Sequence, residues 1–122
     1  MANKEQDLEY IRSQMPLPEL LTVLAEEAAE LGQAALKYRR TLIKGNPTPT
    51  SEKSAYANVL EELGDILNSL EAMELDLNNP IIHAFRKSKI ERWAKRLHEE
   101  EAKQKELADN GTESTAADRV SH

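Results

Sequence analysis

Two similar acidic octets constrain the fold of this chain more than any other feature. They occupy residues 24–31 and 59–66, and both read apolar-x-Glu-Glu-x-x-acid-apolar. On an α-helix, residues three and four positions apart share a face. Glu27 and Glu62 each follow an apolar residue by three positions and precede another by four. The pattern therefore predicts two helices whose core-facing stripes each contain a glutamate.

The acidic residues of the two octets form a candidate metal site. Glu30 and Asp65 lie three residues after Glu27 and Glu62, at the edge of the same helix faces. An unpaired carboxylate inside a protein is costly, so such groups normally have a partner or a metal ion. Hard divalent cations such as Mg²⁺ prefer oxygen ligands. We therefore expect a divalent cation among these four carboxylates.

A solvated acidic helix face is the alternative interpretation of the same residues. Glu26 and Glu61 fit it individually, because they fall at the boundary of the apolar stripe. Glu27 and Glu62 fit it poorly, because they interrupt stripes that are otherwise apolar. Two copies with the same surroundings favour the metal site.

Composition favours a single all-α domain. The chain has 122 residues with only four glycines and five prolines, and alternating strand patterns of useful length are absent. It contains no cysteine, so disulfides and thiolate metal sites are excluded. A net charge of -6 argues against binding to nucleic acid polymers. No run of about 18 apolar residues exists and the N-terminus is polar, so we expect no membrane contact and a cytoplasmic location.

Helix-breaking residues divide the chain into four expected helices. Pro16 and Pro18 end the first, Gly45 to Pro49 separate the second from the third, and Pro80 begins the fourth. The expected helices are 4–14, 19–41, 52–76 and 80–108, with Ser51 as the N-cap of the third. We expect an N-terminal segment at 1–15, a helical domain at 16–104 and a disordered tail at 105–122.

A stripe of small residues runs along the second expected helix. It consists of Ala25, Ala29, Gly32 and Leu36. Small side chains let another helix approach closely, and a small core gains from assembly. The neighbour is either a partner subunit or another helix of the same chain.

The fourth expected helix contains a candidate phosphate-binding cation, Lys89. It lies among apolar residues on the helical wheel and is flanked by Arg92 and Arg96. A cation facing an acidic metal site is suited to triphosphate binding, because the phosphates bridge metal and cation. The alternatives for Lys89 are a salt bridge to one of the carboxylates, or a stem lying over Trp93 with its ammonium in water. Arg92 and Arg96 fit a surface role equally well.

The acidic spacing resembles the signature of a known family. Glu-Glu-x-x-Glu at residues 26–30 and Glu-x-x-Asp at residues 62–65 resemble the motifs of the MazG-like all-α nucleoside triphosphate pyrophosphohydrolases. The resemblance covers roughly residues 17–98, with Lys89 and Arg92 matching a Lys-x-x-Arg pattern after the second motif. The two motifs lie farther apart than in compact members, and the extra length falls in the break at 42–51.

The resemblance implies a fold, a cofactor and a reaction. The fold is a four-helix-type bundle that assembles as a homodimer or homotetramer. Mg²⁺, with Mn²⁺ as a substitute, would be held by Glu27, Glu30, Glu62 and Asp65, while Glu26 would orient or deprotonate water. That water would attack the α-phosphate of a nucleoside triphosphate or deoxynucleoside triphosphate, which yields the monophosphate and pyrophosphate.

Two other functions stay open at this stage. Phosphoribosyl-ATP pyrophosphohydrolase shares the acidic pattern and the alanine-rich helix, although Leu63-Gly64-Asp65 looks more MazG-like. A non-enzymatic helical protein would use the small-residue stripe for assembly and the acids for solubility or a structural metal. That protein would release no phosphate from any nucleotide.

Overall fold

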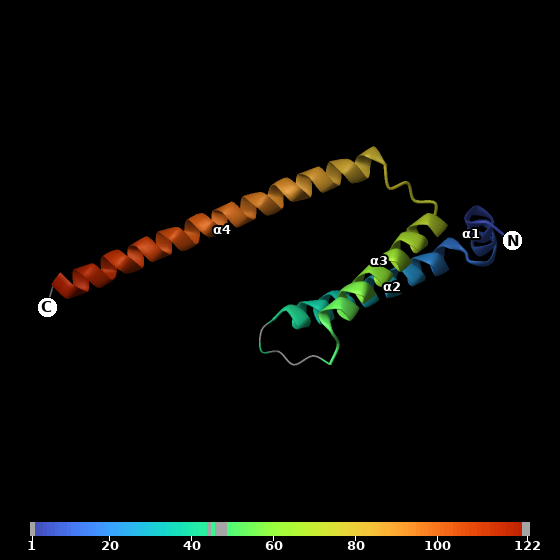
Figure 1. The fold of residues 1–122 in the computed structure, drawn as a ribbon. Coiled ribbons are helices and arrows are strands. Elements are labelled where there is room, and N and C mark those ends of the chain that lie inside the picture. Colours follow the sequence, from blue (N-terminus) through green and yellow to red (C-terminus); the bar gives the residue numbers. More distant parts are fainter. Residues whose placement is uncertain (1, 44, 46–48, 121–122) are drawn as a thin grey trace. The chain divides into compact units, whose positions relative to one another are not determined.

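Helices are the only regular secondary structure in the described part of the chain. The computed structural model describes residues 2–43, 45 and 49–120, and side chains as far as residue 111. The helices are α1 (Lys4–Gln14), α2 (Leu17–Leu42), α3 (Glu52–Ala72) and α4 (Pro80–Val120), in the order in which Figure 1 labels them. The prediction of an all-α chain with four helices is confirmed.

Local capping explains where the first and third helices begin. The Asn3 side chain accepts a hydrogen bond from the Gln6 backbone N–H at 2.9 Å, and the Gln6 side chain accepts one from the Asn3 N–H at 2.9 Å. This reciprocal pair is a capping box. Ser51 caps α3 by accepting a hydrogen bond from the Ser54 N–H at 3.1 Å, as the sequence predicts.

The end of α3 differs from the sequence prediction. The helix ends at Ala72, not at residue 76, because Glu74 adopts a left-handed backbone conformation with φ of 59°. The Glu74 N–H donates to the Glu71 carbonyl at 2.9 Å, and the Leu75 N–H donates to the Leu70 carbonyl at 3.1 Å. These two bonds form a Schellman motif, which usually has glycine at the left-handed position.

Helix α4 also differs from its expected length. It runs to Val120, whereas the sequence predicts an end near Ala108. The added residues 109–120 continue directly from the strong helix formers of residues 99–108, and extending a formed helix is easier than starting one. The expected domain bounds at 16–104 and the expected disordered tail at 105–122 stay predictions.

The chain divides into an N-terminal unit, Met1–Asp76, and a C-terminal unit, Leu77–His122. In the N-terminal unit α2 and α3 lie side by side as an antiparallel hairpin, and α1 packs against α3 (Figure 1). Leu8, Leu20 and Ala72 form the buried cluster where α1 meets the hairpin. The C-terminal unit consists mainly of α4.

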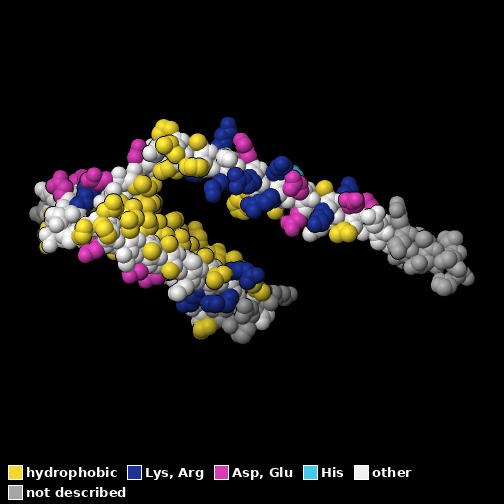
Figure 2. All heavy atoms as spheres, turned by 180° about the vertical axis from the view of Figure 1, so that it is seen from behind, with side chains coloured by type: hydrophobic (Ala, Val, Ile, Leu, Met, Phe, Trp, Pro, Cys, Tyr) yellow, Lys and Arg dark blue, Asp and Glu magenta, His cyan; other side chains and the backbone are white. Residues whose placement is uncertain are grey.

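The helix hairpin leaves much apolar surface exposed. Among the described residues only five apolar side chains are buried, and three of them are alanines. Figure 2 shows hydrophobic side chains gathered over the surface of the hairpin. The exposed large ones on α2 and α3 are Leu17, Leu21, Leu36, Leu42, Tyr56, Leu60, Leu63 and Leu67.

In the described ranges no helix combines the length and the apolar character that crossing a membrane requires.

Candidate metal centre

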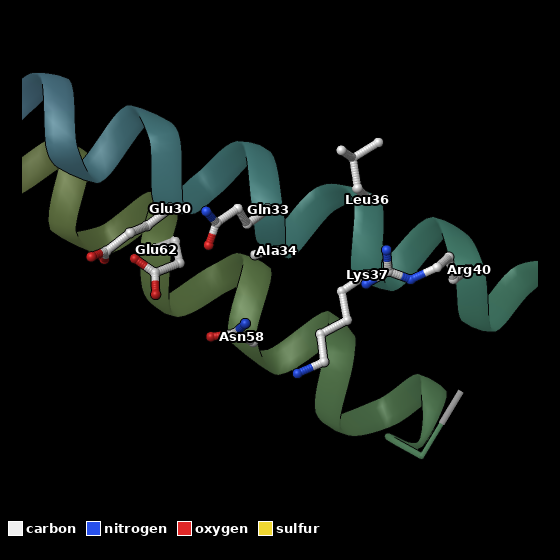
Figure 3. A pocket seen from close by; sticks show the side chains of 8 residues that line it. All are labelled: Glu30, Gln33, Ala34, Leu36, Lys37, Arg40, Asn58 and Glu62. Carbon is white, nitrogen blue, oxygen red and sulfur yellow. The ribbon is translucent and has the colours of Figure 1, made fainter. Parts of the chain in front are cut away.

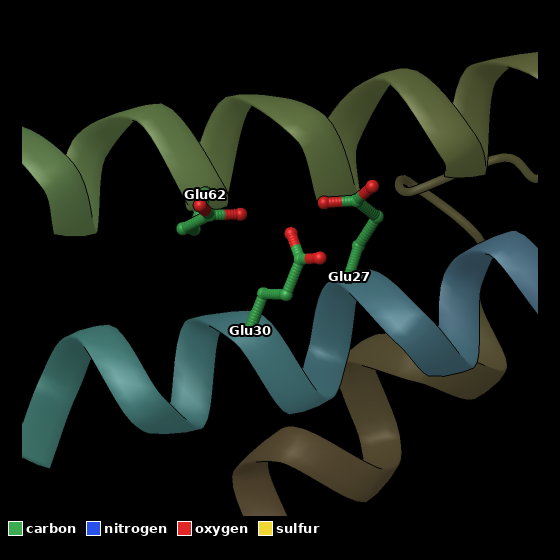
Figure 4. Close-up of side chains that lie close together, drawn as sticks. All are labelled: Glu27, Glu30 and Glu62. Atoms are coloured by element: carbon green, nitrogen blue, oxygen red, sulfur yellow. The ribbon is translucent and has the colours of Figure 1, made fainter.

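The candidate site lies between α2 and α3. Ala34 and Ala55 are only 2% and 1% exposed, so the helices meet there through small side chains and approach closely. Figure 4 shows that Glu27 and Glu30 project from α2 toward Glu62 on α3. One carboxylate oxygen from each of the three glutamates lies within 4.8 Å of those of the other two. The helical spacing of the octets and the close approach together produce this cluster.

Two of these carboxylates have an oxygen that is closed off from solvent. The Oε2 atoms of Glu27 and Glu62 are buried, although each residue as a whole is half-buried. Within the described part of the chain, neither Oε2 atom has a hydrogen-bond partner. Buried polar atoms normally have a hydrogen-bond partner or a metal ion. The described residues supply no partner for these two oxygens, so a ligand from outside the chain is needed to satisfy them.

The cluster raises the pKa values of its half-buried members. Burial, followed by the negative charges of Glu30, Asp65 and Glu62, raises the pKa of Glu27 to about 7. Burial also raises the pKa of Glu62 above its ordinary value, and the nearby Glu30 carboxyl and the negative charge of Asp65 act in the same direction. The ionised forms are therefore under mutual repulsion, which a cation would relieve.

These residues fit a hard divalent cation. All three donors are carboxylate oxygens, the ligand type that Mg²⁺ and Mn²⁺ prefer. Ligands on opposite sides of an octahedral Mg²⁺ lie about 4 Å apart. The 4.8 Å limit of this cluster is close to that value, so small side-chain movements are enough to close it around one ion.

The other predicted site residues lie outside this cluster. Asp65 is half-buried on α3 and acts on both raised pKa values through its charge. Glu26 is exposed on α2. Lys89, Arg92 and Arg96 are exposed on α4, which belongs to the other unit. Their role in phosphate binding stays a prediction.

An open groove of ≈ 640 Å³ begins at two of the clustered carboxylates. It is lined by Glu30, Gln33, Ala34, Leu36, Lys37 and Arg40 of α2, and by Asn58 and Glu62 of α3. Figure 3 shows the carboxylates at one end and the two cations toward the other, with the amides of Gln33 and Asn58 between them. The groove is therefore acidic at one end and basic at the other.

Lys37 and Arg40 are groove residues that the sequence prediction missed. A pair of cations near a helix C-terminus is explained equally well by the helix dipole. The available signal was spacing, because Lys37 and Arg40 follow Glu30 by seven and ten residues, which keeps them near the same side of the helix. Arg39, one position away, does not line the groove.

Comparisons of the chain with protein-family models, with curated proteins and with solved structures find no match. The resemblance to the MazG-like family therefore stays an expectation carried by the residues of the two motifs. What the site can do is inferred below from its geometry and charge.

Proposed function

We propose that this chain is a Mg²⁺-dependent hydrolase that converts a nucleoside triphosphate to the monophosphate and pyrophosphate. The observation that carries the proposal is the convergence of Glu27, Glu30 and Glu62 from two helices, with two buried oxygens that lack a partner. An acidic cluster with an acid-to-base groove beside it suits a ligand that binds through a metal at one end and through cations at the other.

In this proposal each acidic residue has a defined task. Glu27, Glu30 and Glu62 would hold the ion, and Asp65, one turn further along α3, would complete the ligand set. When bound, Mg²⁺ supplies activation of water and neutralises charge on the leaving pyrophosphate. Glu26, by the family resemblance, orients the attacking water or accepts its proton.

Charge explains why an acidic groove would need a cation to accept a triphosphate. Carboxylates repel phosphate oxygens at short range, and the repulsion is strong where solvent is excluded.

In the reaction a water oxygen forms a bond to the α-phosphorus and the bond from that phosphorus to the bridging oxygen of the β-phosphate breaks. The water protons pass to the products and to the accepting carboxylate, and pyrophosphate leaves.

We also propose that the hairpin assembles into a four-helix-type bundle as a homodimer or homotetramer. The supporting observation is the exposed apolar surface of α2 and α3 (Figure 2). The small-residue stripe at Ala25, Ala29 and Gly32 is exposed, and a Cβ added to Gly32 would meet nothing within 4 Å. Apolar surface of this extent marks an interaction site.

Pyrophosphate release tests the proposed reaction. The purified chain is incubated with canonical and modified nucleoside triphosphates and with phosphoribosyl-ATP, in Mg²⁺ and in chelator. We expect Mg²⁺-dependent release of pyrophosphate together with the monophosphate. Glu62→Gln should abolish release, while Glu9→Gln, a matched loss of one exposed carboxylate on α1, should retain it.

Three results would overturn the proposal or change it. Retained hydrolysis in Glu62→Gln, with circular dichroism showing the same helical fold, would exclude this site. Release from phosphoribosyl-ATP alone would favour the alternative pyrophosphohydrolase. Absence of release from every nucleotide would favour the non-enzymatic helical protein.

A further inference from the structure

The basic end of the groove has no assigned role, and its charge is available for a ligand. Lys37 is half-buried and Arg40 is exposed, and both line the groove that starts at Glu30 and Glu62. In the region that the structure describes, neither cation forms a salt bridge or a side-chain hydrogen bond. By contrast, Lys4 and Arg12 of the same unit are paired with carboxylates.

Lys37 and Arg40 are distinguished by their place in the groove, because among the described residues only Lys4, Arg12 and Lys95 form salt bridges. Lys37 is half-buried as a residue and lines the groove together with Arg40, so both positive charges can pair with an anionic ligand there. The helix dipole favours cations in the last turn of α2, where Arg39 and Arg40 lie, but it does not select the side of the helix that faces the groove.

The dimensions of the groove suit a chain of linked phosphates. Seven residues separate Glu30 from Lys37, which corresponds to a rise of about 10 Å along α2. Figure 3 shows the lysine side chain extending into the space beside Asn58. Gln33 and Asn58 lie between the acidic and basic ends, and each amide can donate hydrogen bonds to phosphate oxygens.

We propose that Lys37 and Arg40 bind the distal phosphates of a polyphosphate chain whose other end is held at the carboxylate cluster. The proposal rests on the proposed function for the chemistry of the ligand. It assigns phosphate binding to the hairpin itself. A charge-assisted contact to phosphate from each side chain, with amide donors between them, would fix the direction of the chain in the groove.

Binding of inorganic tripolyphosphate tests this assignment without requiring hydrolysis. The full chain is titrated calorimetrically with tripolyphosphate in Mg²⁺, as wild type, Lys37→Gln, Arg40→Gln and the double variant. Arg39→Gln is the matched control, since it removes the same charge from the same helical turn outside the groove. Circular dichroism and thermal unfolding check that each variant folds.

We expect each groove variant to weaken tripolyphosphate binding about tenfold, and the double variant to weaken it further, because a lost charge-assisted bond has an effect of that size. Arg39→Gln should change the affinity less than about twofold, since an exposed charge is screened by salt. Equal losses in Arg39→Gln and Lys37→Gln would indicate diffuse attraction and overturn the proposal. Unchanged binding in the double variant, or no binding to the wild type, would also overturn it.

The outcome separates this inference from the proposed reaction. The chain could bind tripolyphosphate through Lys37 and Arg40 and yet release no pyrophosphate from any nucleotide. That result would support the phosphate subsite and refute the hydrolase. Hydrolysis with an unchanged KM in the double variant would support the hydrolase and refute the subsite.

Discussion

Raising the pH from 6 to 8 should strengthen metal binding at the cluster of Glu27, Glu30 and Glu62. A carboxylate must lose its proton before it can bind a metal ion. Burial and the neighbouring negative charges raise the pKa of Glu27 to about 7. An ordinary glutamate is fully ionised across this pH range, so an acidic site of ordinary carboxylates would bind metal equally well at both values.

The size of the effect follows from the titration of Glu27 alone. With a pKa of about 7, the carboxyl is roughly one-tenth ionised at pH 6 and roughly nine-tenths ionised at pH 8. The apparent affinity for the ion scales with the ionised fraction, so it should rise about tenfold. The raised pKa of Glu62 acts in the same direction and makes this a lower bound.

Mn²⁺ provides a direct assay, because the electron paramagnetic resonance signal of the free ion reports the unbound fraction. Titrations at constant ionic strength from pH 6 to 8 would give the apparent affinity at each pH. Glu27→Gln should bind more weakly and with a flatter pH dependence, since its amide does not titrate. Glu9→Gln on α1 should behave as wild type. A wild-type affinity that is the same at pH 6 and pH 8 would refute the reasoning.

Further predictions concern stability. Without metal, the raised pKa of Glu27 means that the folded state keeps the Glu27 proton to a higher pH than the unfolded state does. The melting temperature should therefore fall as the pH rises from about 4.5 to about 7. Added Mg²⁺ should reduce this fall. Ala55→Leu should destabilise by about 1–3 kcal/mol in urea titrations, because Ala55 is only 1% exposed and leaves no room at the helix contact. Arg12→Ala should cost about 1–2 kcal/mol, since its guanidinium donates at 3.0 Å and 2.8 Å to the last carbonyls of α3. Glu74→Gly should raise the urea midpoint by the equivalent of about 1 kcal/mol, because glycine adopts the left-handed conformation without strain.

Features that depend on local periodicity were predictable from the sequence. The inward direction of Glu27 and Glu62 follows from apolar neighbours three and four residues away, and the Ser51 cap follows from its position after a proline-rich break. Both need only the geometry of one helix. The resemblance and the spacing together also indicated Glu30 as a member of the cluster.

Features that depend on distant contacts were not predictable. α3 ends four residues early in a Schellman motif built around Glu74, and Arg12 of α1 supports that end by binding the carbonyls of Ala72 and Glu71. No local pattern indicates a contact between residues about sixty positions apart. The position of Lys37 in the groove likewise requires the register of α2 against α3, which spacing within α2 alone does not determine.

The same residues explain both the site and the small core of the N-terminal unit. Glu27 and Glu62 occupy positions on the facing sides of α2 and α3 that leucine would normally fill. The helices can then pack closely only at small residues such as Ala34 and Ala55, so the hairpin buries little apolar surface. The carboxylates in the helix contact repel one another, and two of their oxygens have no partner. Both effects lower the free energy of unfolding of the hairpin. We therefore expect a hairpin built in this way to gain stability from a cation between its helices and from apolar contacts on its outer face, as the two proposals for metal binding and assembly require.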